Sequence, residues 1–219
     1  RRYRCRRVPV NRYNNHYEWS DGPRDRGGRG NGRAIALELA ELGADIIVNN
    51  AGVGGAGSIV TAEKDALREE FHRNLQVHLW GAINCTLETV DGMVETGYGN
   101  VINITSIHTK SGVGMSPQYD VGKFSLLGLT KSLALELGQV GVRVNAVAPG
   151  WTNTRMTAET DPETRERSPS RNPLGRYAEP EEIASAVAFL ASPAADYVNG
   201  HELRVDGGQG PLDSWDSHE

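Results

Sequence analysis

The feature that most constrains the fold is a regular exchange between two hydrophobic patterns along the chain. Short apolar runs, typical of buried parallel strands, occupy residues 45–50, 101–105, 142–147 and 202–205. Longer stretches with apolar residues at helical spacing occupy residues 33–42, 62–95, 119–137 and 180–190. Strands that alternate with helices form a parallel sheet covered by helices on both faces. The sequence therefore predicts an α/β fold in one domain over residues 27–219, with a polar loop at 151–175.

Residues 1–26 show neither pattern, and we expect them to be irregular or disordered. Residues 1–32 contain nine arginines and three acidic residues. Such a basic segment can bind nucleic acid. Here it lacks the fold signals of a nucleic-acid-binding module, so we expect no nucleic-acid partner.

The rest of the chain is acidic, with 14 basic and 25 acidic residues. This balance is typical of an ordinary acidic enzyme, and it also fits a surface adapted to high salt, where counterions screen the repulsion among acidic groups. No apolar stretch approaches the roughly 20 residues that cross a bilayer. The two cysteines, at positions 5 and 85, fit a reducing compartment. We therefore expect a cytoplasmic protein without a membrane partner.

Tyr119 and Lys123 are four residues apart, so they share one face of the predicted helix 119–137. Tyrosine is a weak acid with an ordinary pKa of about 10. A nearby ammonium group favours the phenolate and lowers this pKa, which makes proton exchange with a substrate oxygen feasible. Ser106 closes the strand before this helix, and its hydroxyl can hydrogen-bond the same oxygen. Residues 145–150 end another strand, at the edge where open parallel sheets bind ligands.

Five motifs occur in a fixed order: Asn49-Asn50-Ala51-Gly52, Asn103-Ile104-Thr105-Ser106, Tyr119 with Lys123, Pro149-Gly150 with Thr154, and Asp206-Gly207-Gly208. Together they closely resemble the short-chain dehydrogenase/reductase family, in particular its 3-oxoacyl-ACP reductase-like and glucose dehydrogenase-like members. The resemblance runs from about residue 27 to residue 208. The separation of 13 residues between Ser106 and Tyr119 is the usual one in that family.

The resemblance implies a Rossmann-like sheet and hydride transfer between NAD or NADP and a small carbonyl or alcohol substrate. Tyr119 would be the general acid/base and Ser106 would position the substrate oxygen. Lys123 would hold the nicotinamide ribose and lower the pKa of Tyr119. The resemblance also implies a homo-oligomer, either a dimer or a tetramer. The implied cofactor-binding residues are Gly30, Gly32, Asn49, Asn50, Ala51, Gly52, Tyr119, Lys123, Pro149, Gly150, Thr152 and Thr154.

One departure from the family lies at its fourth catalytic position, where an asparagine normally begins an Asn-Leu-x-Gly motif. The chain reads His78-Leu79-Trp80-Gly81 there. His78 is our candidate for this role, because a histidine can also hold a water molecule in a proton relay. The alternative is a histidine that packs within its helix or binds backbone, and Asn74, one turn earlier, is the weaker substitute. His72, His78 and His108 have no partners at metal-ligand spacing, so no metal site is expected.

A larger departure concerns the cofactor-binding half. A dinucleotide site needs a strand that leads through a glycine-rich turn into a helix N-terminus. Gly30 and Gly32 fit that turn, but Arg26 occupies its first glycine position, and residues 19–25 are polar. Residues 33–42 then run almost directly into the strand at 45–50, where family members place about two further βα units. We therefore expect an incomplete N-terminal half, produced by an internal deletion and a replaced N-terminus.

Two functions are compatible with these residues. The first is an NAD(P)-dependent oxidoreductase that uses Tyr119 as its general acid/base. The second is a catalytically impaired paralogue or deletion product that folds or oligomerises without productive cofactor binding. The retained Ser106, Tyr119 and Lys123 favour the first, and the incomplete cofactor half favours the second.

Overall fold

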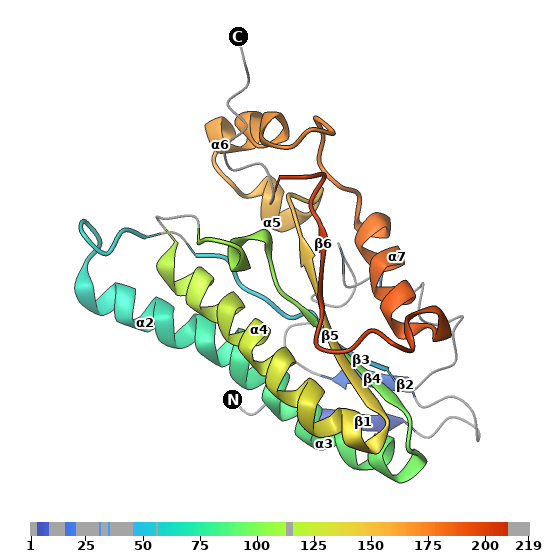
Figure 1. Cartoon of the computed structure of the whole chain (residues 1–219). Helices are drawn as coiled ribbons and strands as arrows, with labels where there is room; N and C mark the ends of the chain where they lie inside the picture. Colours follow the sequence, from blue (N-terminus) through green and yellow to red (C-terminus); the bar gives the residue numbers. More distant parts are fainter. Residues whose placement is uncertain are drawn as a thin grey trace.

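The computed structural model describes residues 4–8, 16–20, 31, 35, 46–55, 57–112 and 116–209. Its centre is a parallel sheet of four strands that lie side by side in chain order: β3 (Ile46–Asn49), β4 (Gly99–Ile104), β5 (Val142–Pro149) and β6 (Glu202–Val205) (Figure 1). The four strands predicted from apolar runs are confirmed. Because all of them point the same way, their carboxyl ends form one edge of the sheet.

The central strands are buried because successive side chains point into two separate cores, as the twofold period of a strand requires. Val101 of β4 and Val144 of β5 are paired in register, and both lie in a core shared with helices α3 (Gly81–Thr96) and α4 (Pro117–Leu137). Ile102 and Val147 point the other way, into a core that contains Ile183 of helix α7 (Pro180–Ala191). The predicted sheet with helices on both faces is therefore confirmed.

The helices follow the predicted order. α2 (Lys64–Leu75), α3 (Gly81–Thr96) and α4 (Pro117–Leu137) lie on one side of the sheet, and α7 (Pro180–Ala191) lies on the other (Figure 1). α4 and α7 each begin with a proline, whose missing N–H costs no helical hydrogen bond there. Glu179 and Glu182 form a capping box at the start of α7. α3 ends at Gly97, which adopts the left-handed conformation that favours glycine.

A π-helical turn, η1 (Gln76–Trp80), interrupts the long helical stretch predicted at 62–95. Such turns are rare and occur often at functional sites. η1 carries His78, the candidate for the fourth catalytic position. The prediction of a long helical stretch is confirmed, but its periodicity gave no sign of this interruption.

Three short elements lie in the segment 151–175, where the sequence predicted a loop: α5 (Arg155–Ala158), α6 (Pro162–Arg167) and the 3₁₀ turn η4 (Pro169–Arg171). Thr154 caps α5 and Asp161 caps α6 through their side chains. Helices this short do not complete a recognisable helical period, which explains why the sequence pattern missed them. Three further 3₁₀ turns connect the main elements: η2 (Ile107–Thr109), η3 (Gly138–Val140) and η5 (Pro193–Ala195).

The N-terminal part differs from the sequence-based expectation in one respect. β1 (Arg4–Val8) pairs with β2 (His16–Ser20) in an antiparallel sheet, within the segment 1–26 where we expected irregular structure. Alternation in a five-residue strand is too short to stand out from composition alone. Most of the predicted helix at 33–42 lies outside the described residues, although Ile35 is helical and buried in the core beneath α7.

β3 is the outer strand of the four-stranded sheet, since within the described part of the chain it pairs with β4 alone. A Rossmann sheet continues beyond this position, so the described residues contain an incomplete version of that sheet. This agrees with the incomplete N-terminal half that the sequence predicts.

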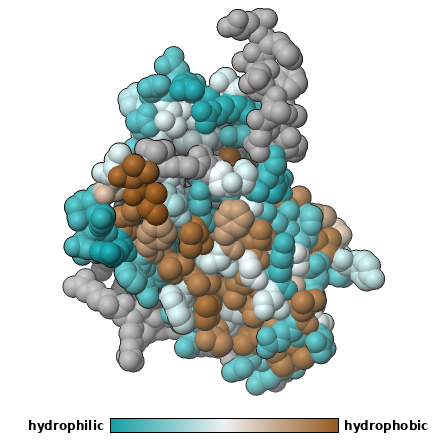
Figure 2. Space-filling model, turned by 60° about the vertical axis from the view of Figure 1, so that its left-hand side comes forward, coloured by the Kyte–Doolittle hydropathy of each residue, from teal (hydrophilic) through white to brown (hydrophobic). Residues whose placement is uncertain are grey.

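Hydrophobic side chains gather on the face of the molecule where α2, α3 and α4 lie (Figure 2). Leu135 of α4 is 78% exposed and Leu87 of α3 is 65% exposed, and both belong to this group of helices. Trp80, Val121 and Phe124 are also exposed on η1 and α4. None of the helices in the described ranges is long and apolar enough to cross a membrane.

Candidate active site

The candidate site lies at the carboxyl ends of β3, β4 and β5, where the first turns of α4 approach the sheet. Ser106 follows β4 directly and is the N-cap residue of η2, where its Oγ accepts a 3.3 Å hydrogen bond from the backbone N–H of His108. Tyr119 and Lys123 are contributed by α4, one turn apart. The fold therefore brings together the three side chains that the sequence predicts for acid–base chemistry.

Lys123 is almost fully buried, at 4% exposure, although it carries an ammonium group. Its Nζ donates a 2.7 Å hydrogen bond to the backbone carbonyl of Ile104, at the end of β4. The same nitrogen lies 5.8 Å from the centre of the Tyr119 ring. Burial lowers the pKa of Lys123 to about 7, because the charged form loses its hydration. Lys123 can therefore gain or lose a proton near neutral pH.

Tyr119 is half-buried, and this burial raises the pKa of its phenol above the ordinary value. Hydrogen bonding to the Ser106 hydroxyl acts in the opposite direction and lowers this pKa, while the negative charge of Asp120 raises it further. The sequence predicted that Lys123 would lower the Tyr119 pKa, and the net shift is the reverse. The reason is that burial of the phenol, which disfavours its charged form, outweighs the hydrogen bond with Ser106.

His78 occupies the centre of the site, at 1% exposure, and its ring meets the Tyr119 ring edge-on with centroids 5.5 Å apart. Its Nε2 accepts a 3.1 Å hydrogen bond from the backbone N–H of Val53, in the loop after β3. Burial and the nearby charge of Lys123 lower the pKa of His78 to about 3. The imidazole is therefore neutral at neutral pH, with its proton on Nδ1.

The His78 imidazole has room because the two residues that face it are glycines, which have no side chain. A Cβ atom on Gly122 would lie 2.5 Å from Nδ1 of His78, and one on Gly52 would lie 3.2 Å from Nε2. His78 thus fills the volume that side chains at these positions would otherwise take. Asn74, the weaker substitute, is fully buried on α2 and donates to the carbonyl of Glu70 at 2.9 Å.

Asn49 at the end of β3 has a role inside the sheet. Its Nδ2 donates a 2.8 Å hydrogen bond to Oδ1 of Asn103 on β4, and Asn103 in turn donates to the Thr130 hydroxyl on α4 at 2.8 Å. This buried chain fixes β3, β4 and α4 relative to one another. Asn50, Ala51 and Gly52 follow at the mouth of the site, and Gly52 is the one that approaches both His78 and Lys123.

The segment after β5 is held against β6 and α7. The backbone N–H of Gly150 donates to the carbonyl of Val205 at 2.9 Å, and a Cβ on Gly150 would lie 2.8 Å from Cα of Asp206. Thr152 is buried and bridges to Ala178 in parallel fashion. Thr154 caps α5. These contacts place residues 149–154 beside the carboxyl end of β5, on the sheet edge that carries Ser106.

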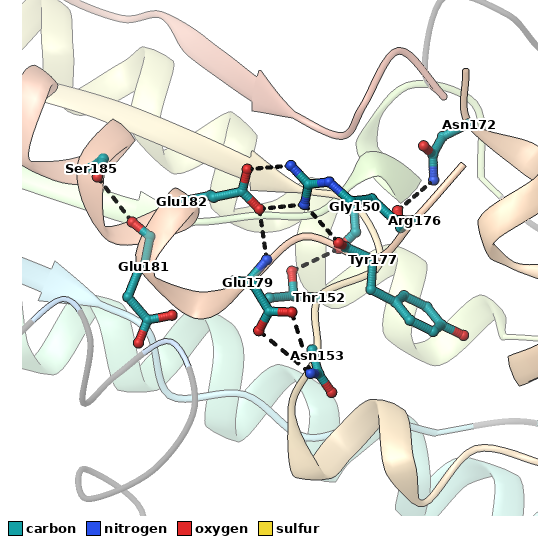
Figure 3. A network of polar contacts seen from close by, with 10 residues as sticks. All are labelled: Gly150, Thr152, Asn153, Asn172, Arg176, Tyr177, Glu179, Glu181, Glu182 and Ser185. Carbon is teal, nitrogen blue, oxygen red and sulfur yellow. Dashed lines mark hydrogen bonds and ion pairs between the residues drawn. The ribbon is translucent and has the colours of Figure 1, made fainter. Parts of the chain in front are cut away.

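A network of polar contacts anchors this segment from the outside (Figure 3). The Arg176 guanidinium donates to both carboxylate oxygens of Glu182 at 2.7 Å, and the neighbouring Glu179 backbone N–H also donates to Glu182. Asn153 donates to the Glu179 carboxylate at 3.4 Å. The Arg176 contact lowers the pKa of Glu182 to about 2. Sequence reasoning missed this network, although the Arg and Glu lie six residues apart across a helix start.

A second pair that the sequence analysis missed lies beside Tyr119. His108 Nδ1 is 2.5 Å from Oδ1 of Asp120, and the His108 ring meets the Tyr119 ring edge-on with centroids 5.1 Å apart. The two residues lie 12 positions apart on different elements, η2 and α4, so no local spacing in the sequence could have paired them.

The described residues fit the nicotinamide half of a dinucleotide better than its other half. Lys123 uses its Nζ for the Ile104 carbonyl and keeps further N–H donors, and a Cβ on Gly52 would lie 3.6 Å from this nitrogen. The predicted pyrophosphate-binding residues Gly30 and Gly32 lie outside the described residues. No group of three His, Cys, Asp or Glu side chains in the described ranges could hold a metal ion.

Comparison with known proteins extends this picture. A family model described as enoyl-(acyl carrier protein) reductase matches residues 33–209. The 3-oxoacyl-[acyl-carrier-protein] reductase of Thermotoga maritima is 37% identical over 164 residues, which are 75% of this chain and 65% of that protein. The 3alpha-hydroxysteroid dehydrogenase of Mediterraneibacter gnavus is 42% identical over 168 residues, which are 76% of this chain and 66% of that protein. The chain therefore spans about two thirds of the length of these relatives.

Solved structures share the fold. A putative 2-deoxy-D-gluconate 3-dehydrogenase from Agrobacterium tumefaciens, with bound NADP, has a TM-score of 0.75 and 29% identity, over 84% of this chain and 93% of that chain. The 3-oxoacyl-[acyl-carrier protein] reductase from Brucella melitensis has a TM-score of 0.74 and 27% identity, over 84% and 88% of the two chains. With the family model matching most of its residues, the chain belongs to the short-chain dehydrogenase/reductase family.

Proposed function

We propose that this chain is an NAD(P)-dependent oxidoreductase that transfers a hydride between a nicotinamide cofactor and a carbonyl or alcohol carbon. The observation that carries the proposal is the convergence of Ser106, Tyr119 and a buried Lys123 at the carboxyl edge of the sheet. A buried ammonium group is costly because it has lost its hydration, and ionisable groups perturbed in this way cluster at functional sites.

In the reducing direction, Tyr119 gives its phenolic proton to the substrate oxygen as the carbonyl carbon is reduced. Ser106 donates a hydrogen bond to that oxygen and keeps it within reach of the phenol. Lys123 supplies positive charge when the phenolate forms, and its pKa of about 7 allows it to pass a proton onward near neutral pH. In the oxidising direction the same groups act in reverse order.

The cofactor supplies the hydride. Lys123 would hold its nicotinamide ribose, and residues 149–154 would contact the nicotinamide, while Asn50, Ala51 and Gly52 would approach the adenosine side. Solved structures of similar proteins that contain NADP support this assignment. We infer either NAD or NADP as the cofactor.

A second candidate function has its own supporting observation. Because β3 is the outer strand among the described residues, the support for the adenosine and pyrophosphate ends of a cofactor is not seen there. The alternative is therefore an impaired paralogue or deletion product that folds and oligomerises without productive cofactor binding.

Substrate and assembly are also proposals. Relatives are named for 3-oxoacyl carrier, hydroxysteroid and gluconate chemistry, so we infer a small carbonyl or alcohol substrate. The exposed Leu87 and Leu135 support a homo-oligomer, a dimer or a tetramer, formed through the helices of this face. We place the protein in the cytoplasm.

The test is transfer of deuterium from NADH or NADPH labelled at the nicotinamide C4 position, supplied at high concentration, to 3-oxoacyl thioesters, ketosteroids and keto-gluconates. Deuterium in the alcohol product, lost in the Tyr119→Phe variant, supports the oxidoreductase. Folded protein that transfers no label to any of these substrates supports the impaired paralogue.

A further inference from the structure

A histidine–aspartate pair lies against the candidate general acid/base and has no part in the mechanism above. His108 Nδ1 and Asp120 Oδ1 are 2.5 Å apart, and the two side chains are only 18% and 14% exposed. The His108 ring contacts the Tyr119 ring edge-on, with an angle of 79° between the planes. Asp120 follows Tyr119 in the first turn of α4. Both members of the pair therefore lie next to the phenol.

The pair connects two elements that must keep a fixed separation. η2 begins at Ser106 and contains His108, while α4 carries Tyr119. On its other side, η2 is tied to β6, because the Thr109 hydroxyl donates to Glu202 at 2.8 Å and the Thr105 hydroxyl donates to the same oxygen at 2.7 Å. The His108–Asp120 contact thus holds the Ser106 turn against α4, and Glu202 holds it against the sheet.

The pair also controls the charge next to the phenol. Asp120 carries a negative charge that opposes formation of the Tyr119 phenolate. The hydrogen bond that the His108 imidazole donates to Asp120 draws part of this negative charge away from the Tyr119 ring. The effect of Asp120 on Tyr119 therefore depends on His108.

Among the described residues, further polar groups next to Tyr119 come from three elements: Lys123 from the same helix, His78 from η1 and Ser106 from the η2 turn. Behind the η2 turn, the Glu202 carboxylate lies 3.8 Å from the Arg204 guanidinium. His78 stays uncharged near neutral pH, since its pKa is about 3. The Lys123 ammonium therefore faces the Tyr119 ring from its own helix, while His108 contacts both the Tyr119 ring and the Asp120 carboxylate.

We propose that His108 and Asp120 form a positioning pair that fixes Ser106 relative to Tyr119 and sets how readily the Tyr119 phenol gives up its proton. The proposal rests on the proposed function for its catalytic meaning. The pair is a property of this chain's own residues and can be tested without cofactor or substrate.

The experiment measures ionisation of Tyr119 directly. The chain is labelled with ¹³C at the tyrosine Cζ, and the Tyr119 resonance is identified by its loss in Tyr119→Phe. The ionised fraction of Tyr119 is then compared at one alkaline pH in the parent, Asp120→Asn, His108→Phe and His108→Gln. The phenylalanine keeps an aromatic edge against Tyr119 but removes the hydrogen-bond donor, and the glutamine restores a donor.

The expected shifts have opposite signs. Asp120→Asn raises the ionised fraction, because the opposing charge is gone. His108→Phe lowers it, because the charge of Asp120 is no longer compensated, and His108→Gln lies between His108→Phe and the parent. Each apparent pKa should move by about one unit or less, the lower end of the range for one neighbouring charge. In the double variant His108→Phe/Asp120→Asn, the result should match Asp120→Asn alone.

Shifts of the same sign, no shift, or a double variant in which the histidine change still acts would overturn the proposal. Thermal melts identify any variant that has lost its fold, and the conservative Asp120→Asn and His108→Gln variants then decide the question. Failure of the parent to transfer hydride contradicts the proposed function alone, since the ionisation measurement needs no turnover.

Discussion

The carboxyl edge of β4 and β5 and the outer edge of β3 differ in how completely they are supported. At the first edge, Lys123 bonds the end of β4, and Asn103 links Asn49 to Thr130. At the second, no strand among the described residues pairs beyond β3. The comparison teaches that the proposed acid–base groups and the proposed dinucleotide site have separate structural supports in this chain, so that one can be well supported while the other is weak.

The largest expected effect is a loss of turnover without a change in cofactor affinity, which depends on the outer edge of β3. Tyr119→Phe should lower turnover by about 10²- to 10⁴-fold, the usual contribution of a general acid/base. The dissociation constant for NADH or NADPH should change little, because the lost hydroxyl is not the cofactor's main support. Steady-state kinetics and calorimetry measure the two quantities. Turnover within a few-fold of the parent would remove Tyr119 from its role.

The second prediction is that the free energy of unfolding depends on pH through the buried Lys123. The pKa of Lys123 falls from 10.5 to about 7 on folding, so the unfolded chain binds more protons between these values. Unfolding free energy should therefore rise with pH from about pH 7 to about pH 9, by at most about 1.4 kcal/mol per pH unit. The rise should end near pH 9 because the pKa of Tyr119 is raised on folding. Above that pH the unfolded chain loses the phenolic proton first, which lowers the free energy of unfolding.

Lys123→Met is the matched control for this measurement, since it keeps the length and apolar stem but cannot titrate. Its denaturant midpoints should vary less with pH over the same interval than those of the parent. Parallel curves for the two proteins would show that the buried ammonium keeps its ordinary affinity for protons.

A smaller effect concerns the affinity for the cofactor, which tests the support at the outer edge of β3. Calorimetric titration should give a millimolar constant for NADH and NADPH, about −4 kcal/mol, because the adenosine end contributes little. Reduced nicotinamide mononucleotide, which lacks that end, should then bind within about threefold of NADH, a difference under about 0.7 kcal/mol. A micromolar constant for either dinucleotide would mean that the N-terminal residues rebuild the missing support.

The smallest expected effect concerns the acidic surface common to both regions. Residues 33–219 contain 14 basic and 25 acidic residues, so their mutual repulsion should decrease in molar potassium chloride. The melting temperature should rise by a few degrees, since about 1 kcal/mol moves it by roughly 2–4 °C for a domain of this size. Melts that are flat or fall with salt would favour the ordinary acidic enzyme over a surface adapted to high salt.

The sequence was sufficient wherever short-range patterns decide the structure. The apolar runs located β3 to β6, and the spacing of Tyr119 and Lys123 correctly predicted that both lie on one face of a helix, α4. It was insufficient where burial or distant contacts decide. The pKa of Tyr119 rises instead of falling because desolvation outweighs the hydrogen bond with Ser106, and His108 meets Asp120 from a different element of the fold. Neither the burial of the phenol nor this contact produces a local sequence pattern from which it could be predicted.

The close approach of Gly122 to His78 limits the order in which this site can change during evolution. A methyl group at position 122 would lie 2.5 Å from the imidazole, well inside any real contact distance. A lineage that holds the histidine is therefore held to glycine at 122, and any larger residue there becomes acceptable only after position 78 has been replaced by something smaller. In ancestral reconstructions, glycine at position 122 should therefore be present before histidine appears at position 78, and it should be lost only after that histidine has been replaced.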